Sequence, residues 1–208
     1  MLVSKHDVVI HGGIVVTCEG AERLDIAVDD GRISALAPEI DEDATERIPA
    51  HGLHVFPGVV DAHVHFNEPG REHWEGIATG SEALAAGGGT CFCDMPLNSA
   101  PPTIDAAAIE AKAAAARRRS LVDFGLWGGL VPGNLGRLDE MAERGAVGFK
   151  AFMCSSGIDD FPAADDLTLL EGMRIAARLG RVVAVHAENG AITGALFRKA
   201  VAEGRSSA

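Results

Sequence analysis

Hydrophobic and polar positions follow two different patterns along the chain, and the change falls near Leu53. Residues 7–37 contain short apolar runs separated by polar turns, with Asp30 and Gly31 as a hairpin turn between two of them. This pattern predicts a small β module over residues 1–53, which we expect to be a β-sandwich. From residue 54 onward, short apolar runs alternate with longer helical segments, which is typical of βα units that build a parallel sheet.

Five βα units can be counted in residues 54–208. Their strands are predicted from short apolar runs at residues 54–61, 90–95, 122–130, 146–152 and 182–186. The clearest helix follows Thr103, its expected N-cap, and ends near a run of arginines that complements the helix dipole. The predicted fold class is α/β, a partial TIM-like (β/α)8 barrel preceded by the β module. A complete barrel takes roughly 250 residues, so we expect residues 54–208 to be the N-terminal part of one.

The composition and charge of the chain exclude several classes of protein. Hydrophobic residues make up 47% and charged residues 23%, as in ordinary folded proteins. Acidic residues outnumber basic ones by 30 to 18, and a net charge of −12 disfavours nucleic acid and anionic membranes as partners. No apolar run is long enough to span a bilayer, and the N-terminus lacks a signal-peptide core. We therefore expect a cytoplasmic protein with reduced cysteines.

Two histidines, His63 and His65, stand where the first predicted barrel strand ends. Side chains alternate along a strand with a period of two, so both imidazoles point to the same face and can hold one metal ion. A His-x-His pair is short and also arises by chance, and incidental polar residues at a strand end are the alternative interpretation. The pair therefore needs support from elsewhere in the chain.

That support begins with Lys150, which lies inside the apolar run 146–152 of a chain with only four lysines. A buried, unpaired ammonium is unfavourable, so it loses its proton or acquires a partner. Two chemical roles fit this position: an amine nucleophile that forms a Schiff base, or a lysine carbamylated by CO₂ whose anionic oxygens bind metal. A side chain that snorkels out of the strand end, or that pairs with an acid, is the structural alternative.

His186 closes the apolar run 182–186 and is followed by polar residues. In an α/β barrel the active site gathers at the C-terminal ends of the strands, and His63, His65, Lys150 and His186 all fall there. A lysine carbamate has two oxygens and can bridge two cations, one bound by His63 and His65 and the other by His186. These four residues are therefore predicted to be the metal ligands and catalytic residues of a two-metal hydrolytic site.

The order of strand-end His-x-His, strand lysine and strand-end histidine resembles the cyclic amidohydrolases of the amidohydrolase superfamily. This group includes dihydroorotases, hydantoinases and allantoinases, and the resemblance covers nearly the whole chain. Dihydroorotases carry an arginine two residues after the second histidine, whereas this chain has Asn67 there. The segments similar to the allantoinase branch are 61–71, 74–76, 94–103, 150–159 and 161–162.

The resemblance implies hydrolysis of the hydantoin ring amide of allantoin to allantoate. It also implies two divalent metal ions, usually zinc, and CO₂ held as a carbamate on Lys150. Asn67, Asn98 and Ser155 lie in predicted strand-end loops and can hydrogen-bond a ureide substrate, while solvated loop residues are the alternative interpretation. The resemblance implies a small-molecule substrate as the partner and a homo-oligomer, a tetramer, for the full-length form.

Complete members of the group continue through three more βα units, which supply a further metal-binding histidine and an aspartate that is both ligand and proton shuttle. Neither can be assigned in this chain, so we expect an incomplete fragment that is inactive alone. A dihydropyrimidinase or hydantoinase, or a dihydroorotase, is the alternative within the group. Two other classes stay open: a Schiff-base lyase that uses Lys150, and a non-catalytic amidohydrolase-like assembly protein.

Overall fold

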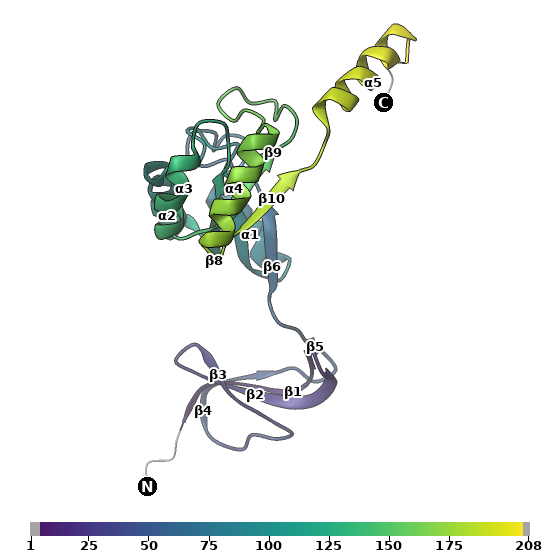
Figure 1. Ribbon diagram of the computed structural model, residues 1–208. Coiled ribbons are helices and arrows are strands. Elements are labelled where there is room, and N and C mark those ends of the chain that lie inside the picture. The colour runs from purple at the N-terminus through teal and green to yellow at the C-terminus, as the bar shows by residue number, and fades with distance from the viewer. Residues whose placement is uncertain (1–4, 206–208) are drawn as a thin grey trace. The chain divides into compact units, whose positions relative to one another are not determined.

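The computed structural model describes residues 5–205 and divides the chain into two compact units, with the division between Gly58 and Val59 (Figure 1). Each unit has its own sheet.

The N-terminal unit is built from the strands β1 (His6–Thr17), β2 (Gly20–Asp29), β3 (Arg32–Ala37), β4 (Ala44–Pro49) and β5 (His54–Val55). They form one sheet in the order β3-β2-β1-β4, with β5 also paired to β1. Asp30 and Gly31 both have positive φ angles, as a tight hairpin turn between β2 and β3 requires. A separate β unit is confirmed, but the described strands make a single sheet rather than the two layers of a sandwich, because the long β1 pairs with β2, β4 and β5.

The second unit contains a five-stranded parallel sheet in the order β10-β9-β8-β7-β6. Its strands are β6 (Val59–Val64), β7 (Gly89–Asp94), β8 (Asp123–Gly129), β9 (Ala146–Phe152) and β10 (Val182–His186). Its helices are α1 (Ile77–Ala86), α2 (Ala106–Arg119), α3 (Leu138–Glu143), α4 (Asp166–Arg178) and α5 (Gly190–Ala202), and the short 3₁₀ helix η1 (Leu135–Arg137) precedes α3. The predicted succession of five βα units is confirmed.

Two local expectations were wrong. The predicted first barrel strand, 54–61, is split: His54 and Val55 pair with β1 in the N-terminal sheet, and the barrel strand begins at Val59. Pro57 and Gly58 separate the two pieces, which a continuous apolar pattern does not reveal. The N-cap of α2 is Asp105, whose carboxylate accepts a hydrogen bond from the Ala108 N–H. Thr103 instead donates its hydroxyl to the Trp127 carbonyl oxygen.

The main core of the second unit lies between the sheet and the helices. α1 contacts β7, α2 contacts β8, and α3 and α4 contact β9. The largest buried cluster includes Leu130, Leu138, Met141 and Phe149, each with no exposed surface. Helix α4 approaches this core closely at Gly172, where an added Cβ would lie 2.4 Å from the Leu130 side chain. The packing fixes the carboxyl ends of the strands, from which the candidate site residues project.

None of the helices in the described part of the chain is long and apolar enough to cross a membrane.

Candidate active site

The carboxyl end of β6 carries the histidine pair. His63 lies in the strand and His65 follows it directly, with the two ring centroids 5.4 Å apart. The Asp61 carboxylate accepts a hydrogen bond of 3.0 Å from the His63 N–H, and the Trp127 indole N–H donates to the Ala62 carbonyl oxygen at 3.0 Å. The backbone on the N-terminal side of the pair is therefore held by a side chain of β6 and by one of β8.

The hydrogen bond of His65 indicates which of its nitrogens can bind a metal. Its Nδ1 lies 2.8 Å from the Leu97 carbonyl oxygen. A carbonyl oxygen can only accept, so Nδ1 carries the proton in the neutral ring and Nε2 keeps a free lone pair. Metal-binding histidines in proteins are usually oriented in this way. The geometry of His65 therefore fits a metal ligand.

Lys150 is the fifth of the seven residues of β9, towards its carboxyl end, and is only 4% exposed. Its ammonium makes no hydrogen bond or ion pair with any side chain or carbonyl of residues 5–205, and its Nζ lies over the Phe152 ring, 5.5 Å from the ring centroid. Burial lowers the pKa of Lys150 below its usual value of 10.5. The neutral amine that this favours is the form that reacts with CO₂ or with a carbonyl group.

His186 is the last residue of β10 and lies near both Phe152 and His63. Its ring stacks on Phe152, with centroids 4.7 Å apart and an interplanar angle of 8°. Burial lowers the pKa of His63, and the nearby Lys150, His65 and His186 lower it further, although Asp61 opposes them. The structure therefore places Lys150, His65 and His186 close enough to His63 to lower its pKa. Neutral imidazoles are the form that binds metal ions.

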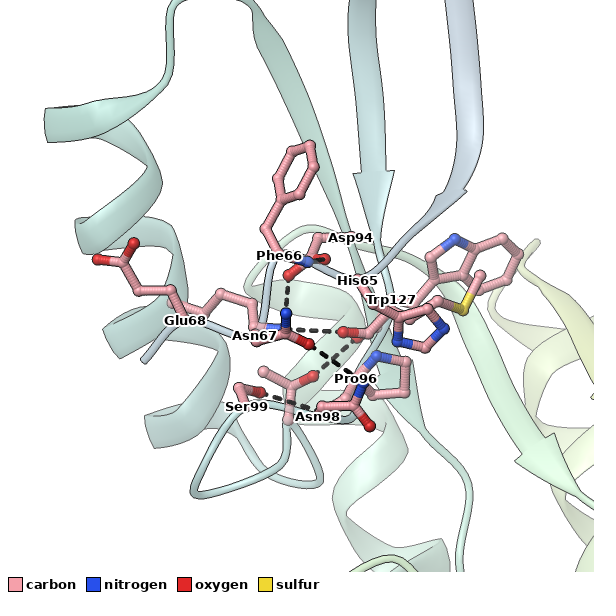
Figure 2. A network of polar contacts seen from close by, with 12 residues as sticks. His65, Phe66, Asn67, Glu68, Asp94, Pro96, Asn98, Ser99 and Trp127 are labelled. Atoms are coloured by element: carbon pink, nitrogen blue, oxygen red, sulfur yellow. Dashed lines mark hydrogen bonds and ion pairs between the residues drawn. The ribbon is translucent and has the colours of Figure 1, made fainter. Parts of the chain in front are cut away.

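A buried ion pair supports the loop that follows His65 (Figure 2). Asp94, at the end of β7, accepts the Phe66 N–H at 2.9 Å through Oδ1 and lies 2.8 Å from the Lys112 Nζ through Oδ2. Lys112 also donates to the Met95 carbonyl oxygen at 2.7 Å. Both charged side chains are 1% exposed. This pair was not predicted from the sequence, although a single lysine within the alanine-rich helix α2 was a visible signal.

A second buried carboxylate, that of Glu68, lies further along the same loop. It accepts the Ile77 N–H at the start of α1 at 3.0 Å and pairs with Arg119 of α2, also at 3.0 Å. The loop between His65 and α1 is thus attached to both neighbouring helices. The position of His65 depends on contacts that lie well outside the metal-ligand set.

The three predicted substrate-binding residues differ in their surroundings. Asn67 is buried, has a φ of 60°, and accepts a hydrogen bond of 3.1 Å from the Asn98 side-chain amide. Asn98 is partly exposed, and Figure 2 shows it in the loop after β7, beside the segment that follows His65. Ser155 is exposed in the loop after β9, where its hydroxyl accepts the Gly157 N–H at 3.2 Å. Asn67 and Asn98 therefore lie together, and each uses one side-chain amide group in the hydrogen bond between them.

Comparison with known proteins identifies the family of this chain. The model of the family described as "Amidohydrolase family" matches residues 54–207, and this match includes all four predicted ligands. The chain belongs to the amidohydrolase family. Members of this family are generally metal-dependent, which agrees with the ligand types gathered at the strand ends.

Several curated relatives of this amidohydrolase chain carry the name allantoinase. That of Solibacter usitatus is 60% identical over 200 residues, which are 96% of this chain and 44% of the relative. That of Deinococcus radiodurans is 55% identical over 200 residues, or 96% of this chain and 45% of the relative. One from Escherichia coli is 45% identical over 206 residues, or 97% of this chain and 45% of the relative. The chain therefore spans less than half the length of the curated relatives it matches.

Solved structures give the same picture of this amidohydrolase fold. The L-hydantoinase (dihydropyrimidinase) from Arthrobacter aurescens superposes with a TM-score of 0.92 at 38% identity, covering 96% of this chain and 44% of that one. A D-hydantoinase superposes with a TM-score of 0.83 at 30% identity, covering 97% of this chain and 44% of that one. The arrangement of sheet and helices described above is thus shared with both hydantoinases.

Proposed function

We propose that this protein acts as a metal-dependent allantoinase, to which this chain contributes one part of the active site. The observation that carries the proposal is that His63 lies near His65, His186 and the buried Lys150, whose amine has no hydrogen-bond or ion-pair partner among residues 5–205. The names of the relatives and the Asn67 side chain, in place of the arginine typical of dihydroorotases, favour allantoin over dihydroorotate.

The ligand types fit two divalent cations, and we propose zinc. His63 and His65 would hold one ion, and His186 would hold the other. Lys150 would bridge them after reaction of its neutral amine with CO₂, because a carbamate offers two anionic oxygens and a free amine offers none. When bound, such ions lower the pKa of water towards ~7 and polarise a carbonyl oxygen.

The chain's own residues would bind and orient the ring. Asn67, Asn98 and Ser155 offer amide and hydroxyl groups that match the donors and acceptors of a ureide. The reaction adds water to the ring carbonyl carbon, breaks the carbon–nitrogen bond, and returns a proton to the leaving nitrogen, giving allantoate. We further propose that the protein is a cytoplasmic homotetramer that acts on this small ureide substrate.

A hydantoinase is the second candidate, because the solved structure described above with a TM-score of 0.92 is an L-hydantoinase. A Schiff-base lyase is a third, supported by the lowered pKa of Lys150. The lyase leaves the histidine pair without a role. Borohydride reduction of the metal-free protein with a carbonyl substrate would attach that substrate to Lys150 only if the lyase is correct.

The experiment joins residues 1–208 to the remaining part of the Solibacter usitatus relative, so that one barrel is assembled from both. We expect kcat/KM for allantoin to exceed that for dihydroorotate and for a 5-substituted hydantoin by more than roughly tenfold. Lys150→Ala should abolish activity and tight metal binding, and intact-mass analysis should show one CO₂ adduct on the parent only. Lys199→Ala, at an exposed lysine of α5, should change neither.

Faster hydrolysis of the hydantoin or of dihydroorotate by the folded chimera would reassign the substrate. Equal metal content in the parent and in Lys150→Ala would show that the lysine is not a bridging ligand. Circular dichroism of each chimera separates these results from a failure to fold.

A further inference from the structure

A thiol, an imidazole and a carboxylate meet beside the candidate active site, at the carboxyl ends of β9 and β10. The Sγ of Cys154, a ring nitrogen of His186 and a carboxylate oxygen of Glu188 all lie within 4.8 Å of one another. Neither Cys154 nor Glu188 has a role in the function proposed above. Within residues 5–205, this is the set of three such groups whose spacing suits a single metal ion.

The backbone holds the two segments that carry these groups close together. The Met153 N–H donates to the His186 carbonyl oxygen at 3.1 Å, directly before Cys154. A Cβ at position 190 would lie 3.3 Å from the Cys154 Cα, so glycine permits a close approach of the start of α5. Asn189 caps that helix by accepting two backbone N–H groups at 3.1 Å. The three side chains therefore project from anchored positions rather than from free loops.

The chemistry of the cluster favours a cation. Glu188 Oε1 lies 2.9 Å from His186 Nε2, and the Cys154 sulfur lies within 4.8 Å of both groups. A thiol binds a divalent cation as the thiolate, so binding here would release the Cys154 proton, and the Glu188 carboxylate would place a second negative charge beside the cation. In tetrahedral sites zinc binds sulfur at ~2.3 Å and histidine nitrogen at ~2.0–2.1 Å, so small movements of the partly exposed Cys154 and His186 and of the exposed Glu188 would complete the geometry.

We propose that Cys154, His186 and Glu188 bind a thiophilic divalent cation such as Zn²⁺, Co²⁺ or Cd²⁺, with one coordination position open to water. A thiolate ligand selects these ions over Mg²⁺ and Ca²⁺, which prefer oxygen. The site does not rest on the proposed function, since two of its three ligands lie outside the allantoinase centre. It shares His186 with that centre, so a cation held here would compete for this histidine.

The test is a Co²⁺ titration of the 208-residue chain, followed by the sulfur-to-cobalt charge-transfer absorption in the near ultraviolet. We expect one equivalent to produce this band, and Zn²⁺ or Cd²⁺ to abolish it by displacement. Cys154→Ala should lose the band, and Cys154→Ser should lose it too. Cys18→Ala, which removes an exposed thiol of the N-terminal unit, should keep it.

Two further variants test whether Glu188 is a ligand and whether the site is separate from the proposed allantoinase centre. Glu188→Gln should keep the sulfur band but weaken Zn²⁺ binding at least ~10-fold, measured by competition with a chromophoric chelator. His63→Ala removes a ligand of the proposed allantoinase centre and should leave the band unchanged. The sulfur-to-cobalt band does not depend on catalysis, so a chain that fails the allantoinase assay should still show the band if the three residues bind a cation.

Absence of the band in the parent chain would overturn the proposal, as would an undiminished band in folded Cys154→Ala. Loss of the band in His63→Ala would also overturn it, because the cation would then belong to the allantoinase centre. Tryptophan fluorescence shows whether each variant is folded, since both tryptophans lie in the second unit and the Trp127 indole is buried there. Cys154 is partly exposed, so its replacement by serine leaves the packing of the core unchanged.

Discussion

Replacing Lys112 by methionine tests whether the buried ion pair of α2 stabilises the loop that carries His65. The Lys112 ammonium is 2.8 Å from the Asp94 carboxylate and 2.7 Å from the Met95 carbonyl oxygen, and both side chains of the pair are 1% exposed. Methionine keeps the approximate volume of the lysine chain but leaves the Asp94 charge with the Phe66 N–H as its described partner. Removing one partner of a buried pair destabilises a protein by about 3–5 kcal/mol.

The free energy of unfolding can be followed by tryptophan fluorescence during urea denaturation. Both tryptophans, Trp74 and Trp127, lie in the second unit, so the signal reports the unfolding of that unit. With m values of about 1–3 kcal/mol per molar urea, the predicted loss lowers the midpoint by more than about 1 M. The control is Arg174→Ala, which breaks the exposed pair with Glu171 and should change stability by less than about 1 kcal/mol.

A double replacement separates charge from packing. Asp94→Asn combined with Lys112→Met removes both charges while asparagine can still accept the Phe66 N–H, so we expect it to regain more than about half of the loss. If Lys112→Met is no more destabilising than Arg174→Ala, the reasoning from burial is refuted. If the double variant is as unstable as the single one, the loss comes from packing rather than from an unpaired charge.

Two other predictions concern glycine positions and pH. Gly172→Ala should destabilise the chain by about 1–3 kcal/mol despite alanine's higher helix propensity, because the new methyl group meets the Leu130 side chain at 2.4 Å. Gly194→Ala in α5 meets only the flexible end of Arg198 and should stabilise by up to about 1 kcal/mol in the same urea assay, and the opposite signs would contradict this account. Burial lowers the pKa of Lys150 in the folded chain below 10.5, its ordinary value. Without CO₂, the contribution of Lys150 to the free energy of unfolding is therefore most favourable above pH 10.5, and it decreases as the pH falls from 10.5 towards the pKa in the folded chain. Lys150→Met should therefore stabilise the metal-free chain more at about pH 7 than at about pH 10, and a gain that did not vary with pH would contradict this assignment.

The apolar pattern predicted the bounds of β9 and β10. Their predicted ranges coincide with the observed ones, because each is a continuous apolar run between polar turns. The run does not show burial, since β9 is mostly buried whereas β10 lies at the edge of the described sheet with Val182 and Val185 exposed. Since the carboxyl ends of parallel strands meet at one edge of the sheet, the same pattern was enough to predict that His63, Lys150 and His186 lie near one another. The pattern failed where one apolar run served two sheets, since His54 and Val55 pair with β1 while Val59 begins β6.

The supporting residues could not be predicted because their partners are distant in the sequence. Lys112 lies 17 residues from the Met95 carbonyl oxygen that it contacts, and Asp94 lies 28 residues from Phe66. No local pattern of apolar and polar residues indicates either contact. The pairing of Asn67 with Asn98, 31 residues apart, is of the same kind. The metal-binding residue types are visible in the sequence, but the contacts that aim them depend on tertiary packing.

The four lysines differ in exposure, so the rates at which they are chemically labelled would measure local unfolding of the second unit. Lys5 and Lys199 are exposed, whereas Lys112 and Lys150 are buried in the second unit. An acylating reagent should therefore modify Lys5 and Lys199 within the first moments and reach Lys150 only when β9 transiently separates from its neighbours. The slow appearance of label on Lys150, resolved by peptide mass spectrometry, would measure how often the candidate active site unfolds locally.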